Sequence, residues 1–312
     1  MRLLAKWACT ELLAQVQVCN RLPSSAQWLP LVVEGDRVGA VRSSDVEAVL
    51  RPVGKDGEPV FRLRASRLEL SAFLEAAEVS TRTAAVAALA EDLRDRGIVT
   101  GWRDEQVAVA SGFGEPPKFL VERAAYPFLG AKGYGVHVNG FSRIDDDDTI
   151  ELWVARRSDT KETWPGLLDH IVAGHQPFGL SPTENVIKEA GEEAGIPEDL
   201  ASKALAVGAV SYYGVDEELR LKNDALFCFD LDLPENFQPT AVDGEVQAFY
   251  RWPLPKVLDA ILQGEFKPNV VIVIADFLIR RGFLSPDMPD YLPLVKALRQ
   301  EEPNQPPLPS SS

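Results

Sequence analysis

The sequence predicts an α/β protein whose main domain is built on a mixed β-sheet and is preceded by a small α+β domain. Three observations predict this fold. After residue 130, short apolar runs with period-two alternation are typical of strands, and one long helical pattern beginning at Pro182 interrupts them. Before residue 113, helical and strand patterns alternate on a smaller scale. Between the two lies "SGFGEPPK", residues 111–118, whose glycines and prolines indicate a domain boundary.

The composition is typical of a globular protein. Its 312 residues suffice for two domains, and a hydrophobic content of 46% can fill their cores. The formal net charge of -15 argues against nucleic acid as a partner, because nucleic acid binding needs a basic face. No apolar run is long enough to predict a membrane span, and Lys6 and Glu11 interrupt the N-terminal stretch, which is typical of an amphipathic helix. Three widely spaced cysteines predict neither disulfides nor a zinc site, so we expect a cytoplasmic protein.

We place an N-terminal accessory domain at residues 1–115, the main domain at 116–290 and a disordered tail at 291–312. The accessory domain is expected to begin with a helix, to continue with two strands around the turn at Glu34–Asp36, and to contain a helix within 81–99. Its sequence does not decide among capping a cleft, setting specificity and forming dimer contacts. The tail ends in "EEPNQPPLPSSS", which has too few apolar residues to pack.

The main domain is expected to contain five strand regions and one long helix. Ser181 is the expected cap of this helix, Pro182 its first residue, and Glu184 the partner that completes a capping box. Four aspartates, Asp145 to Asp148, lie between the first two strands, where a solvated hairpin tip is favoured over a calcium site. The predicted strands are 134–143, 150–158, 170–174, 205–214 and 225–233.

Three carboxylates on the long helix are the strongest indication of a functional site in this sequence. Residues three and four apart share a helix face, so Glu189, Glu192 and Glu193 are expected to project together and to repel one another. Gly191 lowers helix stability further, by about 0.5 to 1 kcal/mol relative to alanine. An exposed acidic face explains many such clusters. The alternative is a hard divalent cation, which prefers carboxylate oxygens and removes their repulsion.

The stretch from Gly174 to Ile196, called the box below, resembles the signature of the Nudix hydrolases, G-x5-E-x7-R-E-U-x-E-E-x-G-U, where U is a bulky aliphatic residue. Leu180 stands in place of the first glutamate, Lys188 in place of the arginine, and Ala190 is smaller than the usual aliphatic residue. In the family that glutamate and arginine support the geometry of the loop and helix, so their replacement implies a restructured loop. The matching positions are Gly174, Glu189, Glu192, Glu193, Gly195 and Ile196.

Further segments between Gly101 and Gly282 resemble one branch of this family, whose members carry an N-terminal extension and which fungi fuse to thiamine pyrophosphokinase. They include "VERAAYPFLGAKGYGVHVNGF" and "LWVARRSDTKETWPGLLDHIVAG". The resemblance implies an α/β/α sandwich as the fold of the main domain. It also implies hydrolysis of the diphosphate linkage in thiamine diphosphate, or in its damaged oxo and oxy analogues, to give the monophosphate.

Hydrolysis of a diphosphate needs cations on its negative oxygens and a water placed in line with the breaking bond. We expect Glu189, Glu192 and Glu193 to hold Mg²⁺, with Mn²⁺ as the other candidate, and the carbonyl of Gly174 to add a neutral ligand. The general base is either a box glutamate, Glu192 or Glu193, or Glu245 in "DGEVQ". Glu245 is equally a candidate metal ligand or a surface residue.

Basic side chains are the candidates for binding the substrate's phosphates. Arg156, Arg157 and Lys161 form the basic cluster nearest the box in sequence. Adjacent strand residues point to opposite faces, so one of the two arginines is expected to face the site, where its guanidinium would bind phosphate oxygens in a fork. Ordinary surface charge is the alternative. Lys267 in "FKPN" is a further candidate.

One tryptophan and three histidines are candidates either for contacting the substrate or for a structural role. Trp164 is a candidate for stacking on a thiamine ring, with core packing as the alternative. His175 lies within the box and is expected to line the site. His137 and His170 lie on strand-like runs, where structural hydrogen bonding is favoured.

We therefore expect a Mg²⁺-dependent Nudix diphosphatase acting on a small-molecule diphosphate, with no nucleic acid or membrane partner and with a homodimer as one candidate assembly. Two alternatives stay open. One is a Nudix hydrolase of nucleoside diphosphate derivatives such as ADP-ribose. The other, suggested by Leu180 and Lys188, is a weakly catalytic sensor that binds a diphosphate in the same cleft.

Overall fold

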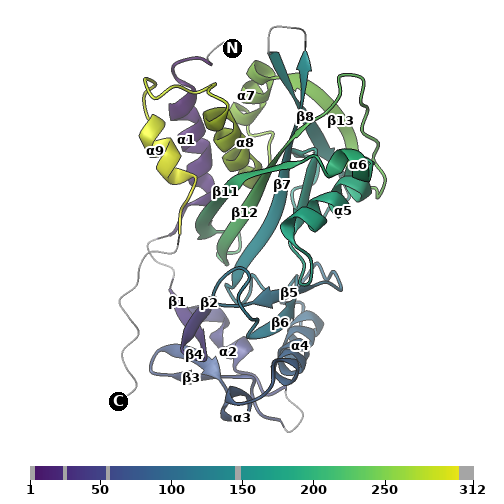
Figure 1. Ribbon diagram of the computed structural model, residues 1–312. Coiled ribbons are helices and arrows are strands. Elements are labelled where there is room, and N and C mark those ends of the chain that lie inside the picture. The colour runs from purple at the N-terminus through teal and green to yellow at the C-terminus, as the bar shows by residue number, and fades with distance from the viewer. Residues whose placement is uncertain (1–3, 24–26, 54–56, 145–148, 302–312) are drawn as a thin grey trace.

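The computed structural model describes residues 4–23, 27–53, 57–144 and 149–301. Two parts lie one above the other in Figure 1, a smaller one made mainly by the N-terminal third of the chain and a larger one made by the rest. The long strand β7 (Lys132–Ile144) begins at the junction between them and runs into the larger part.

The smaller part contains a four-stranded sheet with helices, and this confirms the predicted α+β unit. The strand order is β2-β1-β4-β3, with β1 antiparallel to β2 and parallel to β4. At the predicted turn after β1, Glu34 and Gly35 have positive φ angles of 53° and 86°. The elements are β1 (Trp28–Val33), β2 (Asp36–Arg42), the 3-10 helix η1 (Ser43–Asp45), α2 (Val46–Val49), β3 (Phe61–Arg64), β4 (Arg67–Leu70), α3 (Ala72–Glu75) and α4 (Val79–Asp95).

Two more strands, β5 (Gln106–Val109) and β6 (Phe119–Glu122), pair antiparallel next to α4. One hydrophobic core joins them to the four-stranded sheet and includes Phe61, Leu89 and Phe119. The boundary expected after residue 115 therefore falls inside a β-hairpin. The glycines and prolines of residues 111–118 make the connection of this hairpin, because turn residues mark tight loops as well as linkers.

The larger part is built on a mixed sheet with the strand order β11-β12-β7-β8-β13. Strand β7 is parallel to β12 and antiparallel to β8, and the two short strands β10 and β9 pair antiparallel with β7 and β8. Four of the five predicted strands are present, and the fifth, 170–174, is divided at Ile171 between β9 and β10. The bounds of the strands after β7 are β8 (Thr149–Arg157), β9 (Leu168–His170), β10 (Val172–His175), β11 (Leu205–Val215), β12 (Leu221–Asp232) and β13 (Val246–Pro253).

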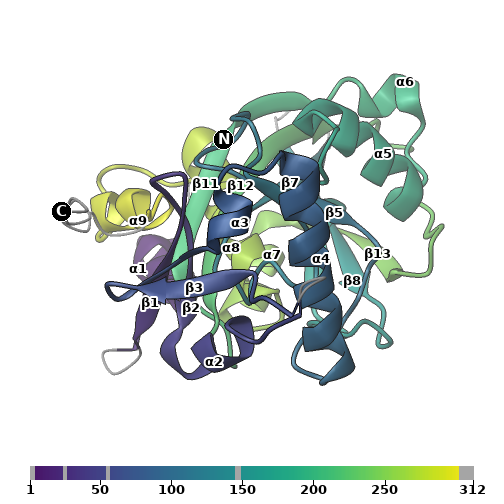
Figure 2. The same ribbon diagram turned by 90° about the horizontal axis from the view of Figure 1, so that it is seen from below.

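Helices cover both faces of this sheet, so the larger part has the α/β/α arrangement that the resemblance implies. In Figure 2, α5 and α6 lie on one side of the sheet, and α1 and α9 lie on the other. Separate hydrophobic clusters fill the two interfaces. The helices are α1 (Ala8–Cys19), α5 (Pro182–Ala194), α6 (Glu198–Ala201), α7 (Leu254–Leu262), α8 (Pro268–Arg280) and α9 (Tyr291–Ala297).

The N-terminal helix belongs to the larger part, which corrects the expectation that residues 1–115 form one accessory domain. The buried face of α1, formed by Ala8, Cys9, Leu12 and Val16, shares a core with α7, α8 and α9. An amphipathic helix must bury its apolar face, but the helix pattern does not say which part of the chain covers it.

The chain is also ordered beyond the predicted end of the main domain, so the tail prediction is wrong for residues 291–301. Helix α9 buries Leu294 and Ala297 in the main core. The residues after it add to the edge strand β11, where Ser211 donates to Leu298 O and accepts from Gln300 N. The rest of the predicted tail, and the aspartates at 145–148, lie outside the described residues.

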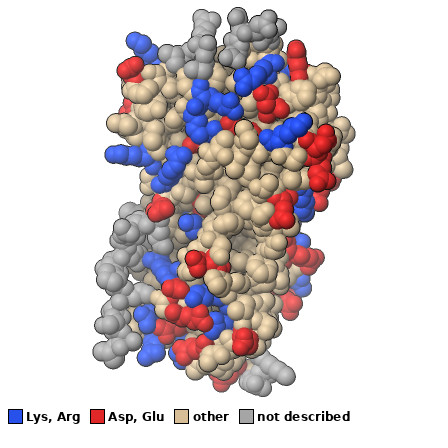
Figure 3. Space-filling view, viewed as in Figure 1, with Lys and Arg blue, Asp and Glu red and all other residues tan. Residues whose placement is uncertain are grey.

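None of the described helices is long and apolar enough to cross a membrane. On the face of the molecule in Figure 3, acidic and basic side chains are interspersed over both parts.

Truncation of a buried side chain on α9 tests whether this helix is part of the core. We predict that Leu294→Ala lowers the free energy of unfolding by about 2 to 5 kcal/mol, because Leu294 is fully buried. The matched control is Leu292→Ala on the same helix, at a side chain that is 67% exposed, which should change stability by less than about 0.5 kcal/mol. Urea unfolding of both variants measures this, and equal effects would contradict the packing of α9.

Candidate active site

Helix α5 begins as the sequence predicts. Ser181 Oγ accepts a hydrogen bond from Glu184 N, while the Glu184 carboxylate accepts one from Ser181 N, which makes a complete capping box with Pro182 in the first turn. The helix ends at Gly195, which has a left-handed conformation with φ of 60°. The apolar face of α5 packs on the sheet through Val186, Ala190 and Ala194.

The contact between α5 and β10 positions two of the three box glutamates. A Cβ atom on Gly174 would lie 2.5 Å from Cγ and Cδ of Glu189, so only glycine leaves room for this side chain. Glu193 Oε2 accepts a hydrogen bond of 2.9 Å from Ala173 N. Glu192 lies farther out, with 53% of its side chain exposed.

Burial disfavours the charged forms of the two inner carboxylates. It raises the pKa of Glu193 well above its ordinary value, and repulsion from Glu189 adds to the shift, although the hydrogen bond from Ala173 opposes it. Burial also raises the pKa of Glu189. A divalent cation fits this oxygen donor set, because it would compensate the lost hydration and remove the repulsion.

Lys188, which replaces the usual arginine of the signature, contacts two of the same carboxylates. Its Nζ lies 3.2 Å from Glu189 Oε1 and 2.8 Å from Glu192 Oε2. The ammonium group therefore offsets part of the repulsion expected from the sequence. A metal ion that used both oxygens would have to displace this ammonium group.

The loop before α5 is held by amide side chains that the sequence did not point to. Gln176 Nε2 donates to Leu180 O at 2.6 Å, and Asn185 Nδ2 donates to His175 O at 2.8 Å. Both amide residues are buried. These two hydrogen bonds hold the loop between β10 and α5 to the start of the helix.

A small cavity opens beside Glu193. It contains two of the predicted catalytic residues, Glu193 and Glu245, and one of the predicted phosphate-binding arginines, Arg157. It also contains Asp169, which the sequence reasoning did not select, although an acid within the apolar run "LLDHIV" was an available signal. The complete lining is Ala155, Arg157, Asp169, His170, Ala173, Glu193, Glu245 and Val246.

Arg157 is held by protein groups on all three nitrogens of its guanidinium. Nη1 donates to Asp169, while Nε and Nη2 donate to the backbone carbonyl groups of residues 164 and 163. It therefore fixes the loop that follows β8. Arg156 donates to Gln247 and does not line the cavity, so the two arginines separate as strand alternation predicts.

The loop after β8 also approaches the cavity through Lys161, whose Nζ lies 2.5 Å from Glu245 Oε2. Burial acts to raise the pKa of Glu245, but the hydrogen bond from Lys161 and the nearby positive charges bring it below its ordinary value. Glu245 is therefore ionised at neutral pH. In the same loop Trp164 has a positive φ of 54°, and its side chain is 38% exposed.

Asp169, which also lines the cavity, forms ion pairs with two cations. Its Oδ2 lies 3.0 Å from Arg157 Nη1 and 3.4 Å from Lys267 Nζ, and its Oδ1 accepts from the backbone N of His170. Burial acts to raise the pKa of Asp169, but positive charge, chiefly that of Lys267, lowers it to about 2. The predicted substrate-binding residue Lys267 is thus paired with a carboxylate at the edge of the site.

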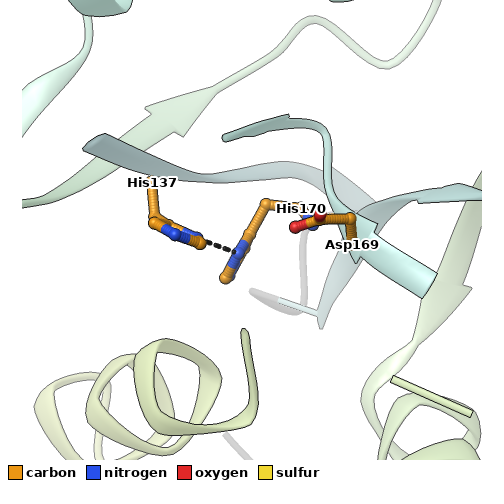
Figure 4. Close-up of side chains that lie close together, drawn as sticks. All are labelled: His137, Asp169 and His170. Carbon is orange, nitrogen blue, oxygen red and sulfur yellow. Dashed lines mark hydrogen bonds between the residues drawn. The ribbon is translucent and has the colours of Figure 1, made fainter. Parts of the chain in front are cut away.

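Two histidines, one of them next to this carboxylate, point toward each other (Figure 4). The Nδ1 atoms of His137 and His170 are 2.9 Å apart, and His170 Nε2 lies 3.2 Å from Asn139 Oδ1. Asn139 Nδ2 donates to Asp230, so the amide oxygen is the atom that faces the ring. His170 therefore carries its proton on Nε2 and accepts from His137 through Nδ1. This is the structural hydrogen bonding that we expect for both histidines.

One ring nitrogen of His137, one of His170 and a carboxylate oxygen of Asp169 lie within 4.8 Å of one another, close enough to hold one metal ion. We interpret this cluster as a hydrogen-bonded network. Burial lowers the pKa of His170 to about 4 and that of His137 well below its ordinary value, so both rings are neutral. The charge of Asp169 is already matched by two cations. The box carboxylates offer the better site for a hard cation.

His175 lies outside the cavity, against the N-terminal part. Its Nδ1 is 3.7 Å from Glu105 Oε1, and its ring centre is 5.2 Å from that of Tyr126. Burial lowers the pKa of His175 to about 3, so the ring is neutral at physiological pH. The contact joins the box to the hairpin of β5 and β6 and does not place His175 among the residues that line the cavity.

Substitution of Gly174 tests the packing of the box. We predict that Gly174→Ala weakens Mn²⁺ binding at least about tenfold, because the added Cβ displaces Glu189. The matched control is Gly191→Ala on α5, where a Cβ meets nothing within 4 Å; it should stabilise the helix by about 0.5 to 1 kcal/mol and leave metal binding unchanged. Calorimetric titration with Mn²⁺ measures both, and equal affinities would contradict the tight contact.

The raised pKa of Glu193 predicts a pH-dependent stability in the presence of a chelator. A carboxyl group whose pKa is raised by folding stabilises the protein fully below its ordinary pKa of 4.5, and this contribution is lost as pH rises through the folded-state value. Glu193→Gln should therefore raise the melting temperature at pH 8, and the gain should shrink toward pH 4. Thermal melts across this range measure it, with the exposed Glu235→Gln as control. A gain that does not depend on pH would contradict the prediction.

Comparison with known proteins places both parts of the chain in known families. Residues 133–273 match the family model described as the NUDIX domain, and residues 11–133 match a domain of unknown function, DUF4743. A solved structure of the NUDIX domain of Shewanella oneidensis NrtR, complexed with ADP ribose, is 16% identical, with a TM-score of 0.38 over 48% of this chain and 89% of that chain.

Two relatives from Arabidopsis thaliana align with nearly the whole chain. Nudix hydrolase 24, chloroplastic, is 40% identical over 93% of this chain and 78% of its own length. Nudix hydrolase 20, chloroplastic, is 39% identical over 94% of this chain and 79% of its own length. Together with the box at the edge of a carboxylate-lined cavity, these matches show that the chain belongs to the Nudix hydrolases, enzymes that act on phosphorus-containing anhydrides.

Proposed function

We propose that this Nudix hydrolase uses Mg²⁺ to cleave the diphosphate linkage of thiamine diphosphate or of its damaged oxo and oxy analogues, leaving the monophosphate. Nudix hydrolases generally use divalent metals. The observation that carries the proposal is the pair of inner carboxylates, Glu189 and Glu193, held where α5 meets β10. Glu193 lines a cavity that also contains the guanidinium group of Arg157.

Glu189, Glu192 and Glu193 are the residues that would hold the metal ion. When bound, a divalent cation neutralises diphosphate oxygens and lowers the pKa of a coordinated water. Glu192 lies on the exposed side of the cluster, where a substrate can reach it, while the two inner glutamates are fixed by backbone contacts. Glu189 and Glu193 would thus hold the ion from the protein side, and the ion would stay accessible to the substrate on the side of Glu192.

Glu245 is the best candidate for the general base. It lines the cavity with Glu193, and its low pKa keeps it ionised, so it can accept a proton at neutral pH. Lys161 contacts its carboxylate and orients it. Because that ammonium group also carries positive charge to the cavity edge, a bound phosphate would compete with Glu245 for Lys161.

The preference for a thiamine compound rests on the family branch and on the loop after β8. Arg157 fixes the backbone of this loop at residues 163 and 164, and Lys161 ties the loop to Glu245 at the cavity. The exposed indole of Trp164 is carried by the same loop. An aromatic face suits a cationic thiazolium ring, and the formal net charge of -15 also favours a substrate with a positive group.

The second candidate function is a diphosphate-binding sensor with weak turnover. The observation that favours it is the ammonium group of Lys188, which contacts Glu189 and Glu192 where a metal ion would bind. Binding of a diphosphate together with negligible turnover would support this candidate.

Product analysis with a panel of substrates tests the proposal. Purified protein with Mg²⁺ is given thiamine diphosphate, its oxo and oxy analogues, ADP-ribose and a nucleoside triphosphate. We expect monophosphate chiefly from the thiamine compounds, and a turnover about two orders of magnitude lower for Glu192→Gln, because the variant loses one metal-binding charge. The exposed Glu235→Gln is the control and should match the unsubstituted protein.

The pattern of products separates the alternatives. Cleavage confined to ADP-ribose or nucleotides would contradict the thiamine assignment and keep the Nudix chemistry. Unchanged turnover of Glu192→Gln would remove Glu192 from the metal site.

The cellular location and the oligomeric state are part of the same proposal. We propose a cytoplasmic protein, with a homodimer as one candidate assembly; fractionation of cells and light scattering of the purified protein test these two points.

A further inference from the structure

An ion pair connects the N-terminal part to the loop after β8. The hairpin of β5 and β6 lies on the side of the smaller part that faces the larger part (Figure 1). Just before β5, Arg103 Nη2 lies 2.8 Å from Oε2 of Glu162, which belongs to this loop. The same oxygen lies beside Gly101, where an added Cβ would be 2.7 Å from it. The Glu162 carboxylate therefore contacts the N-terminal part at two residues.

The backbone that carries Arg103 is fixed by a buried carboxylate. Glu122, at the end of β6, is 8% exposed, and its Oε1 accepts hydrogen bonds of 2.9 Å from Arg103 N and 3.2 Å from Ala124 N. Beside it, Trp102 Nε1 donates to Asp104 Oδ1 at 2.9 Å. The guanidinium group thus extends from a backbone that is held in place, and its contact with the loop is a fixed point.

Lys161, the neighbour of Glu162, connects this fixed point to the cavity. Its Nζ lies 2.5 Å from Oε2 of Glu245, which lines the cavity with Glu193. The backbone of the loop is joined to the same place, since Ser158 N donates to Glu245 O at 2.8 Å and Lys161 N donates to Ser158 O at 3.2 Å. A displacement of Glu162 would therefore move the ammonium group that contacts Glu245.

The two halves of the loop have different anchors. Arg157 donates to the backbone carbonyl groups of residues 163 and 164 and so fixes the second half. The first half is held by Glu245 of the larger part and by Arg103 of the smaller part. The position of Lys161 therefore depends on a contact that the larger part does not provide.

We propose that Arg103 is a positioning residue of the active site, which holds the loop after β8 at the cavity through Glu162. The N-terminal part would thereby set the position of Lys161 beside Glu245, and that of the loop that carries Trp164. A loop that is ordered before the substrate arrives needs no ordering during binding, so substrate binding is stronger. The inference rests on the proposed function for the reaction that it serves, and its contacts suit any diphosphate ester.

Reversal of the two charges, singly and together, tests the pair in the full chain without substrate. In Arg103→Glu and in Glu162→Lys, like charges meet where the ion pair was, so the amide hydrogens of Ser158 and Lys161 should exchange about tenfold faster. The double variant restores opposite charges, and its exchange rates should return to within about threefold of those of the unsubstituted protein. Hydrogen exchange followed by mass spectrometry measures these rates.

Two controls separate positioning from a general loss of stability. The amide of Lys118, which donates to Val109 O at 2.8 Å within the hairpin, should exchange at the same rate in all variants. The matched variant is Arg96→Glu, because Arg96 pairs with Asp92 at 3.0 Å and is 31% exposed, close to the 33% of Arg103. It should leave exchange in the loop unchanged.

Kinetics of the same variants test whether the position of the loop matters to the reaction. With the member of the substrate panel that is cleaved fastest, each single variant should lower kcat/KM about tenfold. The double variant should recover to within about threefold of the unsubstituted protein. A residue with a merely structural role would show no such recovery when the two charges are exchanged.

The outcomes separate this inference from the proposed function. Where no member of the panel is cleaved, the hydrolase proposal fails, and hydrogen exchange alone decides the inference. Unchanged exchange of Ser158 and Lys161 in both single variants overturns it, even where the panel is cleaved. An equal acceleration at Lys118, a double variant without recovery, or an unchanged kcat/KM of the single variants overturns it too. Where Arg103→Glu fails to fold in thermal melts, Arg103→Gln replaces it, with an expected change of about threefold.

Discussion

The close packing of α5 against β10 is the contact on which the rest of the site depends. Because Gly174 has no side chain, Glu189 can pass within contact distance of the strand, and the helix comes near enough for Glu193 to accept a hydrogen bond from Ala173. This places two carboxylates in surroundings that raise their pKa values. Burying two neighbouring carboxylates is unfavourable on its own, and a cation that binds both of them compensates this cost.

The loops around this contact are held by groups that also set the charge of the cavity. Asp169 fixes Arg157 and Lys267, and Arg157 in turn fixes the loop that carries Trp164. The N-terminal part also packs against the site, since it contacts both this loop and the box. The site is therefore a product of the whole chain, and the smaller part is not an independent attachment.

Local patterns in the sequence predicted the elements that carry the chemistry. The capping box at Ser181 and Glu184 fixed the register of α5, and with it the shared face of the box glutamates. Strand alternation correctly predicted that Arg156 and Arg157 would separate. These features depend on neighbours in the chain, so the sequence alone suffices to find them.

Contacts between distant segments were not predictable in this way. The apolar face of α1 gives no sign that it packs on α8 and α9. Cys9, for example, contacts Met288, in the segment between α8 and α9, at a separation of 279 residues. Likewise, the glycines and prolines of residues 111–118 are compatible with a linker and with a hairpin. Gln176 and Asn185 hold the box loop through backbone carbonyls, for which no residue pattern exists. Pairing of this kind is decided by tertiary packing.

The most direct test of the central claim is the position of a bound metal ion. Anomalous diffraction from crystals grown with Mn²⁺ locates the ion without reference to any substrate. The account predicts a peak within coordination distance of carboxylate oxygens of Glu189 and Glu193, at about 2.0 to 2.2 Å. A peak at His137, Asp169 and His170 with none at the box would contradict it.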